Sequence, residues 1–444
     1  MKIKHINSSC VIIESNNVKI LCDPWFVSGE YYGSWHIYPP LDLEENFFND
    51  IDYIYVSHIH PDHFSRKSFE KLNKDIPVLI HAYDSPFLKM NIERLGFNVT
   101  ELMHNKKTLL KNDVSINILA ADNCNPELCA KFMGCGLIET NYKSTQIDSL
   151  CVISDNNYCV LNTNDCPYDL SSQAIDMVMN QYKKIDFLLV GYGGAGPYPQ
   201  CFELSDNERA EAEENKMTQF LSQAESYINQ IKPEFYMPFA GTYTLAGNLF
   251  KLDERKAVPD ISYAKKYLTK SKVIKSNSKC ILLNTNTYFD LNTKEKSQEY
   301  IPINLKEKKI YMHEILSKIK LDYQSEEEPN IEQIKELIEP AYLRMENKRS
   351  EMKFSSDTIW YIEIDNNNFV EVSMNGSGFN FVNDLDESKD YVAYKLDSRL
   401  LFNILQGPRY AHWNNAEIGS HIKFKRCPNK FERGIYHSIN FFHS

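Results

Sequence analysis

The 444-residue sequence has no long apolar run, no block of basic residues and no signal-peptide pattern at its start. A membrane-spanning helix needs about 20 largely apolar residues in a row, and no stretch comes near that length. Lys and Arg number 49 against 60 Asp and Glu, which gives a net charge of −11. Such an acidic chain offers no positive field to nucleic-acid phosphates or anionic membranes. We therefore expect a cytoplasmic protein that binds neither nucleic acid nor membrane and acts on a small molecule.

The 11 cysteines are an odd number and are scattered along the chain. This pattern argues against a disulfide scaffold and indicates reduced thiols. Cys124, Cys129 and Cys135 lie in one segment and could bind an ion or a cluster. Their spacing matches no specific ligation motif, so buried thiols are the favoured interpretation.

Two domains are expected from the order of apolar segments. The apolar runs over 10–14 and 18–22 flank Ser15, Asn16 and Asn17, a pattern typical of a β-hairpin. Strand-like runs then alternate with helical patterns, which indicates a layered domain over 1–295. The composition of the polar segment 284–300 predicts a linker or an edge loop. We predict a smaller α+β domain over 296–444.

The strongest chemical signal is the segment Ser57-His58-Ile59-His60-Pro61-Asp62-His63, directly after an apolar strand. Alternate residues of an extended chain project to one side, so His58 and His60 can converge on one ion. The turn at Pro61 lets Asp62 and His63 approach a second position. Imidazole and carboxylate together suit Fe, Zn or Mn and leave room for water. The segment therefore predicts a site for one or two divalent metal ions; a surface histidine cluster is the alternative.

This H-x-H-x-D-H pattern resembles the metallo-β-lactamase fold superfamily. The resemblance implies an αββα sandwich, with Asp23 supporting the histidine loop through hydrogen bonds. It also implies that Asp165, which follows the strand-like run over 158–161, bridges two metals. As a lone residue, Asp165 could equally be an ordinary turn aspartate.

Longer stretches narrow the resemblance. CDPWF, SHIHPDH, VLNTNDC, GGAGPYP and YMPFAG occur in one order within roughly the first 260 residues. They are similar to the catalytic domain of the CMP-N-acetylneuraminate hydroxylase family and its bacterial relatives. The stretch over 412–424 is similar, more weakly, to the sterol-carrier type of end domain. The smaller domain could then bind an apolar ligand, form one wall of the active site or mediate the formation of a homodimer.

Three departures from this family matter. The sequence has no C-x-H followed by C-x-x-H, so no Rieske cluster can be ligated by it. No histidine occurs between His104 and His313, although the superfamily usually supplies a third one from the loop before its bridging aspartate. The late histidine expected after the PFAG stretch is missing as well. Asp122 or Asn125 could replace one of these ligands, and oxygen donors would favour Fe or Mn over Zn.

Substrate-binding candidates lie in three loops. His36, in an aromatic loop, could face the metal pocket or be a packed loop histidine. Asn125 could contact substrate if it does not bind metal. Gly194 could present a backbone N–H group to an anion, although a tight turn explains that glycine equally well.

Three functions remain open from the sequence. The first is a metal-dependent hydrolase in which Asp62 positions or deprotonates a metal-activated water, with a phosphorylated, nucleotide-linked or sugar-like substrate. The second is a non-haem iron oxygenase that acts on an activated amino sugar and takes electrons from a separate protein. The third is a non-catalytic binding protein with a decayed metal site.

Overall fold

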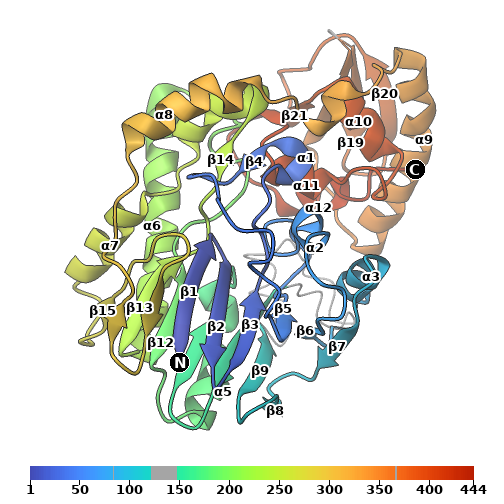
Figure 1. Ribbon diagram of the computed structural model, residues 1–444. Coiled ribbons are helices and arrows are strands. Elements are labelled where there is room, and N and C mark those ends of the chain that lie inside the picture. Colours follow the sequence, from blue (N-terminus) through green and yellow to red (C-terminus); the bar gives the residue numbers. More distant parts are fainter. Residues whose placement is uncertain (84, 122–147, 366–367) are drawn as a thin grey trace.

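The computed structural model describes residues 1–83, 85–121, 148–365 and 368–444. Two large β-sheets pack face to face, helices cover their outer sides, and a smaller sheet with its own helices lies beyond one end of this sandwich (Figure 1). Within these four segments, no helix combines the length and the apolar character that crossing a bilayer requires.

The first large sheet contains the chain's amino-terminal hairpin. Its order is β17 (Glu295–Lys296), β16 (Tyr288–Asp290), β1 (Lys2–Asn7), β2 (Cys10–Ser15), β3 (Val18–Cys22), β5 (Tyr53–Tyr55), β6 (Val78–His81) and β7 (Val99–Leu102). The predicted hairpin is present as β2 and β3, which pair antiparallel. Asn16 and Asn17 turn the chain with φ of 49° and 60°, the left-handed conformation that a two-residue hairpin turn requires.

The second large sheet carries the middle of the chain. Its order is β15 (Lys279–Cys280), β13 (Phe235–Phe239), β12 (Phe187–Gly191), β11 (Cys159–Asn162), β10 (Ser149–Ser154), β9 (Ser115–Ala120) and β8 (Thr108–Leu109). A separate two-stranded ribbon pairs β4 (Trp35–His36) with β14 (Thr244–Leu245).

Alternation along the strands explains the layers. Ile13 lies in the core between the two large sheets, while its neighbour Ile12 faces the outer layer, because successive side chains of a strand point to opposite faces. The outer layer of the first sheet includes α2 (Arg66–Phe69) and α3 (Phe87–Arg94). The second sheet is covered by α5 (Tyr168–Gln181), α6 (Asp206–Ile231) and α7 (Ile261–Lys270). The predicted αββα sandwich is confirmed.

The polar segment 284–300 forms edge strands in the structure. β16 pairs with β1 through the register of Phe289 with Ile3, and Phe289 is buried in the core between the sheets. Leu291 of the same segment is buried in that core as well, so two apolar residues anchor this otherwise polar stretch to the sheet, a contact that its composition does not reveal.

The smaller α+β part contains a five-stranded sheet in the order β20 (Gly378–Val382), β19 (Asn368–Ser373), β18 (Ile359–Asp365), β21 (Tyr391–Lys395) and β22 (Lys423–Cys427). Its helices are α9 (Ile331–Glu351), α10 (Ser398–Leu405), α11 (Trp413–Ile418) and α12 (Arg433–Ile439). The preceding helix α8 (Leu305–Glu314) packs instead on the larger part, where Met312 lies against Ala246. The domain boundary between 295 and 296 and the sterol-carrier likeness both stay predictions.

The two parts share buried contacts. Phe202, from the loop before α6, stacks on Phe424 of β22 with ring centroids 4.5 Å apart and an angle of 5° between the rings. The backbone joins at the same place, because Phe424 N–H donates to the Cys201 carbonyl at 2.9 Å and its own carbonyl accepts from Glu203 N–H at 2.9 Å. The smaller part is therefore docked by packing and by hydrogen bonds together.

We predict that Phe424→Ala lowers the free energy of unfolding by about 3–5 kcal/mol, because a fully buried aromatic side chain leaves a cavity when truncated. Urea unfolding followed by tryptophan fluorescence measures the change. Phe431→Ala is the matched control, since Phe431 is 60% exposed and its truncation leaves no cavity. Equal losses in the two variants would contradict the docking role of Phe424.

Candidate metal centre

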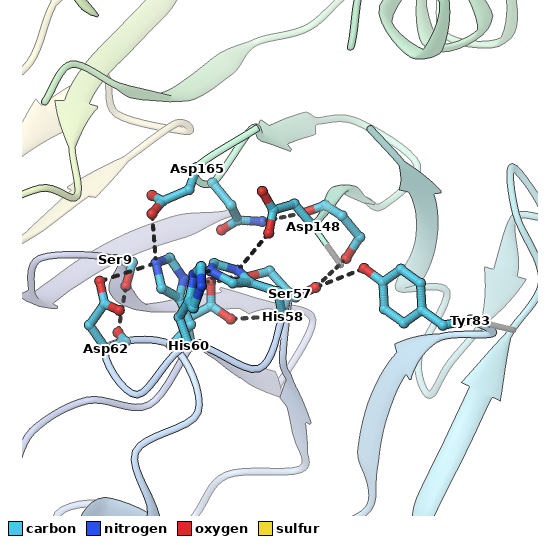
Figure 2. A network of polar contacts seen from close by, with 12 residues as sticks. Ser9, Ser57, His58, His60, Asp62, Tyr83, Asp148 and Asp165 are labelled. Carbon is cyan, nitrogen blue, oxygen red and sulfur yellow. Dashed lines mark hydrogen bonds and ion pairs between the residues drawn. The ribbon is translucent and has the colours of Figure 1, made fainter. Parts of the chain in front are cut away.

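The ends of four strands meet at one edge of the sandwich. β3 and β5 run parallel, so Asp23 after β3 and His58 after β5 emerge side by side. In the other sheet β10 and β11 run antiparallel, which brings Asp148, just before β10, to the same end as Asp165, just after β11. Figure 2 shows the histidine loop facing Asp148 and Asp165 across this edge.

Asp23 anchors the histidine loop. Its Oδ1 accepts from Ser57 N–H at 2.7 Å, and its Oδ2 accepts from the Ser57 hydroxyl at 2.8 Å and from His63 Nδ1 at 2.8 Å. Asp23 is fully buried and has a φ of 45°. The structure therefore gives Asp23 the supporting role that the family resemblance implies.

The tautomer of His58 follows from this anchor. The single proton of the Ser57 hydroxyl goes to Asp23, so the Ser57 oxygen accepts from His58 Nδ1 at 2.9 Å. His58 Nε2 then carries a lone pair, 2.9 Å from Nδ1 of His60. Burial, with His63 and His60 nearby, holds the pKa of His58 well below its usual value. Two ring nitrogens thus converge as the sequence predicts.

His63 faces two carboxylates with its other nitrogen. Because Nδ1 donates to Asp23, Nε2 is left 3.3 Å from Asp165 Oδ2 and 3.5 Å from Asp62 Oδ2. Burial opposes a charge on this ring, but Asp165, Asp62 and Asp23 outweigh it and raise the pKa of His63 well above its usual value. A positive charge, either a proton or a cation, is needed between these groups.

Asp148 is a carboxylate of this centre that the sequence analysis missed. Its Oδ1 lies 3.8 Å from His58 Nδ1, and the residue is 5% exposed. Burial raises the pKa of Asp148 to about 6. The signal for Asp148 in the sequence is its place immediately before a buried strand, whereas Asp122 and Asn125, the predicted replacements for the missing histidine, lie earlier in the chain.

The residues present fit a metal ion. Among the described residues, His63 Nε2 and Asp148 Oδ1 are buried and find no hydrogen-bond partner, and buried polar atoms are normally satisfied. Ligand atoms lie within 4.8 Å of one another in two groups: His58, His63 and Asp165 form one, and His58, His60 and Asp148 form the other. Asp62 Oδ2 stands beside the first group. Three imidazoles and three carboxylates therefore surround this edge.

Tyr31 also belongs to the centre and was missed. Its hydroxyl donates to Asp62 Oδ1 at 2.6 Å, which leaves Asp62 Oδ2 directed at His63. Tyr31 and Tyr32 have φ of 49° and 57°, a left-handed conformation that is strained for aromatic residues. Strain of this kind often marks a functional position, but the aromatic composition of the loop did not indicate which ring reaches the site.

The other predicted residues are placed differently. His36 lies in β4; burial lowers its pKa, and the charged groups acting on it are Lys67 and Asp322. At Gly194 an added Cβ would lie 1.8 Å from the Phe220 ring, so helix α6 packs directly on that backbone. The substrate-binding roles of His36 and Gly194 stay predictions. Asp122, Asn125 and the cysteines at 124, 129 and 135 lie outside the described residues.

An αββα sandwich with histidines and aspartates at one edge defines a class of metal-dependent proteins. A family model for a Beta-lactamase superfamily domain matches residues 2–240. The chain therefore belongs to the β-lactamase superfamily.

The chain is also similar in sequence to curated proteins whose names refer to an iron-sulfur protein or to a hydroxylase. It is 29% identical over 248 residues to a protein of Mycolicibacterium smegmatis named as a Rieske 2Fe-2S iron-sulfur protein, over 54% of this chain and 43% of that protein. It is 23% identical over 253 residues to the cytidine monophosphate-N-acetylneuraminic acid hydroxylase of Danio rerio, over 54% of this chain and 38% of the relative. The match thus spans less than half of either relative.

Among solved structures, an isothiocyanate hydrolase from Delia radicum gut bacteria superposes with a TM-score of 0.46 and 9% sequence identity. That match covers 66% of this chain and 99% of the other. Proteins named as hydrolases and as hydroxylases are thus both found among the similar proteins.

We predict that Asp23→Ala, measured with chelator present, lowers the free energy of unfolding by about 3–5 kcal/mol, because it leaves buried partners without their carboxylate. Urea unfolding measures the loss. Asp176→Ala is the control, since Asp176 is an exposed aspartate whose side chain accepts a hydrogen bond from Gln230 at the surface. An Asp23 variant as stable as this control would show that the anchor does not hold the loop.

Proposed function

We propose that this chain is a non-haem iron-dependent oxygenase that hydroxylates a small molecule. The observation that carries the proposal is the donor set, in which Asp62, Asp148 and Asp165 equal the imidazoles in number. Carboxylate oxygens favour iron or manganese, whereas histidine-rich sets suit zinc. The names of the sequence relatives, an iron-sulfur protein and a hydroxylase, support the same reaction class.

The residues divide between two cation positions. His58 Nε2, His60 Nδ1 and Asp148 would hold one ion, and Asp62, His63 Nε2 and Asp165 would hold the other. Iron held there would supply the redox chemistry for inserting one atom of dioxygen into a C–H bond and releasing the second as water, with two electrons and two protons from a donor. The chain's own groups hold the ligand atoms in place: Asp23 orients His63, and Tyr31 orients Asp62.

We propose that the electrons come from a donor outside these 444 residues, and the name of the Mycolicibacterium smegmatis relative, an iron-sulfur protein, supports such a donor. The substrate class we propose is an activated, nucleotide-linked sugar. Its support is the substrate that the name of the Danio rerio relative states.

A metal-dependent hydrolase is the second candidate, and the exposure of Asp165 favours it. The Asp165 side chain is 34% exposed and lies 3.3 Å from His63 Nε2, so water can reach that cation position. A bound cation would lower the pKa of such a water toward neutrality, and Asp62 would position it or accept its proton. A decayed site fits less well, because buried histidines and carboxylates without a cation are costly to keep together.

We predict that the protein, dialysed anaerobically against equal concentrations of Fe²⁺, Mn²⁺ and Zn²⁺, retains iron in preference to zinc. Mass spectrometry of the metals measures the occupancy of the two groups. The iron-loaded protein with a chemical reductant should consume dioxygen, and a variant with both His58→Ala and His60→Ala should not. Selective zinc uptake, with ester or phosphoester cleavage that proceeds without oxygen, would replace the oxygenase by the hydrolase.

We predict that Asp148→Ala loses the cation held with His58 and His60, because two neutral imidazoles bind an ion weakly without a third donor. Asp148→His should restore binding but shift the preference from iron toward zinc, since it exchanges an oxygen donor for a nitrogen. Asp155→Ala, at the other end of the same strand, is the matched control and should keep the wild-type metal content. Unchanged metal content and preference in both Asp148 variants would remove Asp148 from the ligand set.

A further inference from the structure

The smaller part of the chain reaches the metal centre through one side chain. Asn414, in α11, places its amide oxygen 3.3 Å from His60 Nε2. The two residues are 354 positions apart in sequence, and both are half-buried. No other described side chain is recorded as bonding that nitrogen.

The contact selects which nitrogen of His60 can bind an ion. An amide oxygen only accepts, so it accepts a hydrogen bond from the N–H at His60 Nε2. The neutral ring then carries its lone pair on Nδ1, the atom 2.9 Å from His58 Nε2. Two lone pairs that face each other at this distance repel unless a cation lies with them, so the Asn414 contact matches the ion-binding form of the pair.

Asn414 is itself held by both parts of the chain. Its backbone N–H donates to Nδ1 of His412, which caps α11, and the N–H of His412 donates to the Tyr32 hydroxyl at 2.7 Å. The adjacent Trp413 is buried and donates from Nε1 to the Phe442 carbonyl at 2.8 Å. α11 is therefore fixed in the core of the smaller part while Asn414 projects toward His60.

A second contact joins the same two regions independently. His421, just beyond α11, donates from Nε2 to the Tyr31 carbonyl at 2.8 Å, and the Tyr31 hydroxyl donates to Asp62. The segment over 412–421 thus supports one residue of each proposed cation position.

We propose that Asn414 is a positioning residue for His60, so that the smaller part of the chain completes the metal centre. This inference rests on the proposed metal-dependent function. Ligand histidines commonly donate their second N–H to an oxygen acceptor that fixes the tautomer and raises the basicity of the bound nitrogen. Here that acceptor comes from outside the β-lactamase superfamily match.

The test measures Fe²⁺ affinity anaerobically by competition with a chromophoric chelator. Asn414→Ala should weaken binding at one cation position about 10-fold to 100-fold, as loss of such a partner does. Asn414→Asp keeps an acceptor and should bind at least as tightly as the wild type. Asn403→Ala is the matched control, because Asn403 is an asparagine of the same part whose side chain hydrogen-bonds Glu326 and Gln406, away from the metal centre.

Hydrogen–deuterium exchange gives a readout that does not depend on activity. Loading Fe²⁺ should slow exchange over 410–421 in the wild type and in Asn414→Asp, but not in Asn414→Ala. Asn414→Leu, which keeps the side-chain volume without the acceptor, should behave as Asn414→Ala and serves as a second variant where the alanine variant does not fold.

The outcomes separate the two proposals. Wild-type affinity in both Asn414→Ala and Asn414→Leu would overturn the positioning role and leave the metal centre standing. An Asp variant as weak as the alanine variant would also overturn it, because the amide would then act as a donor. A wild type that binds no Fe²⁺ would overturn this inference and the proposed function together.

Discussion

A fully buried carboxylate holds the candidate centre in shape. Asp23 accepts from the backbone and hydroxyl of Ser57 and from His63, and these three bonds orient both ends of the histidine loop. Through the Ser57 hydroxyl the same carboxylate decides the tautomer of His58. A charge buried at 0% exposure is stable only when its oxygens are satisfied, so the anchor and the loop depend on each other.

The consequence is a set of ring nitrogens that already face inward. His63 Nε2 is directed at Asp62 and Asp165, and His58 Nε2 is directed at His60. Each position concentrates lone pairs or negative charge that only a proton or a cation can balance. The centre is preorganised in this sense: its ligand atoms are oriented by hydrogen bonds that a cation would not need to rearrange.

Much of the fold could be predicted from local patterns. The hairpin around Asn16 and the strand before His58 each follow from short-range periodicity and turn chemistry. The pairing of β16 with β1 could not, because the partner strand lies almost 290 residues earlier in the chain and no local pattern points to it. The polar segment 284–300 acquires its strand structure by pairing with β1 and not from its own composition.

The candidate site shows the same contrast between residues placed by local patterns and residues placed by long-range packing. His58, His60, Asp62 and His63 lie within six positions, so strand alternation and one turn are enough to predict that they converge, and the sequence by itself determined this cluster. Asp148 and Asn414 joined it only in the tertiary structure. One comes from the opposite sheet and the other from the smaller part, and no local pattern encodes the packing of two sheets or the docking of α11. Long-range burial decides which distant side chains face the histidines, because side-chain periodicity predicts a residue's face but not its partner.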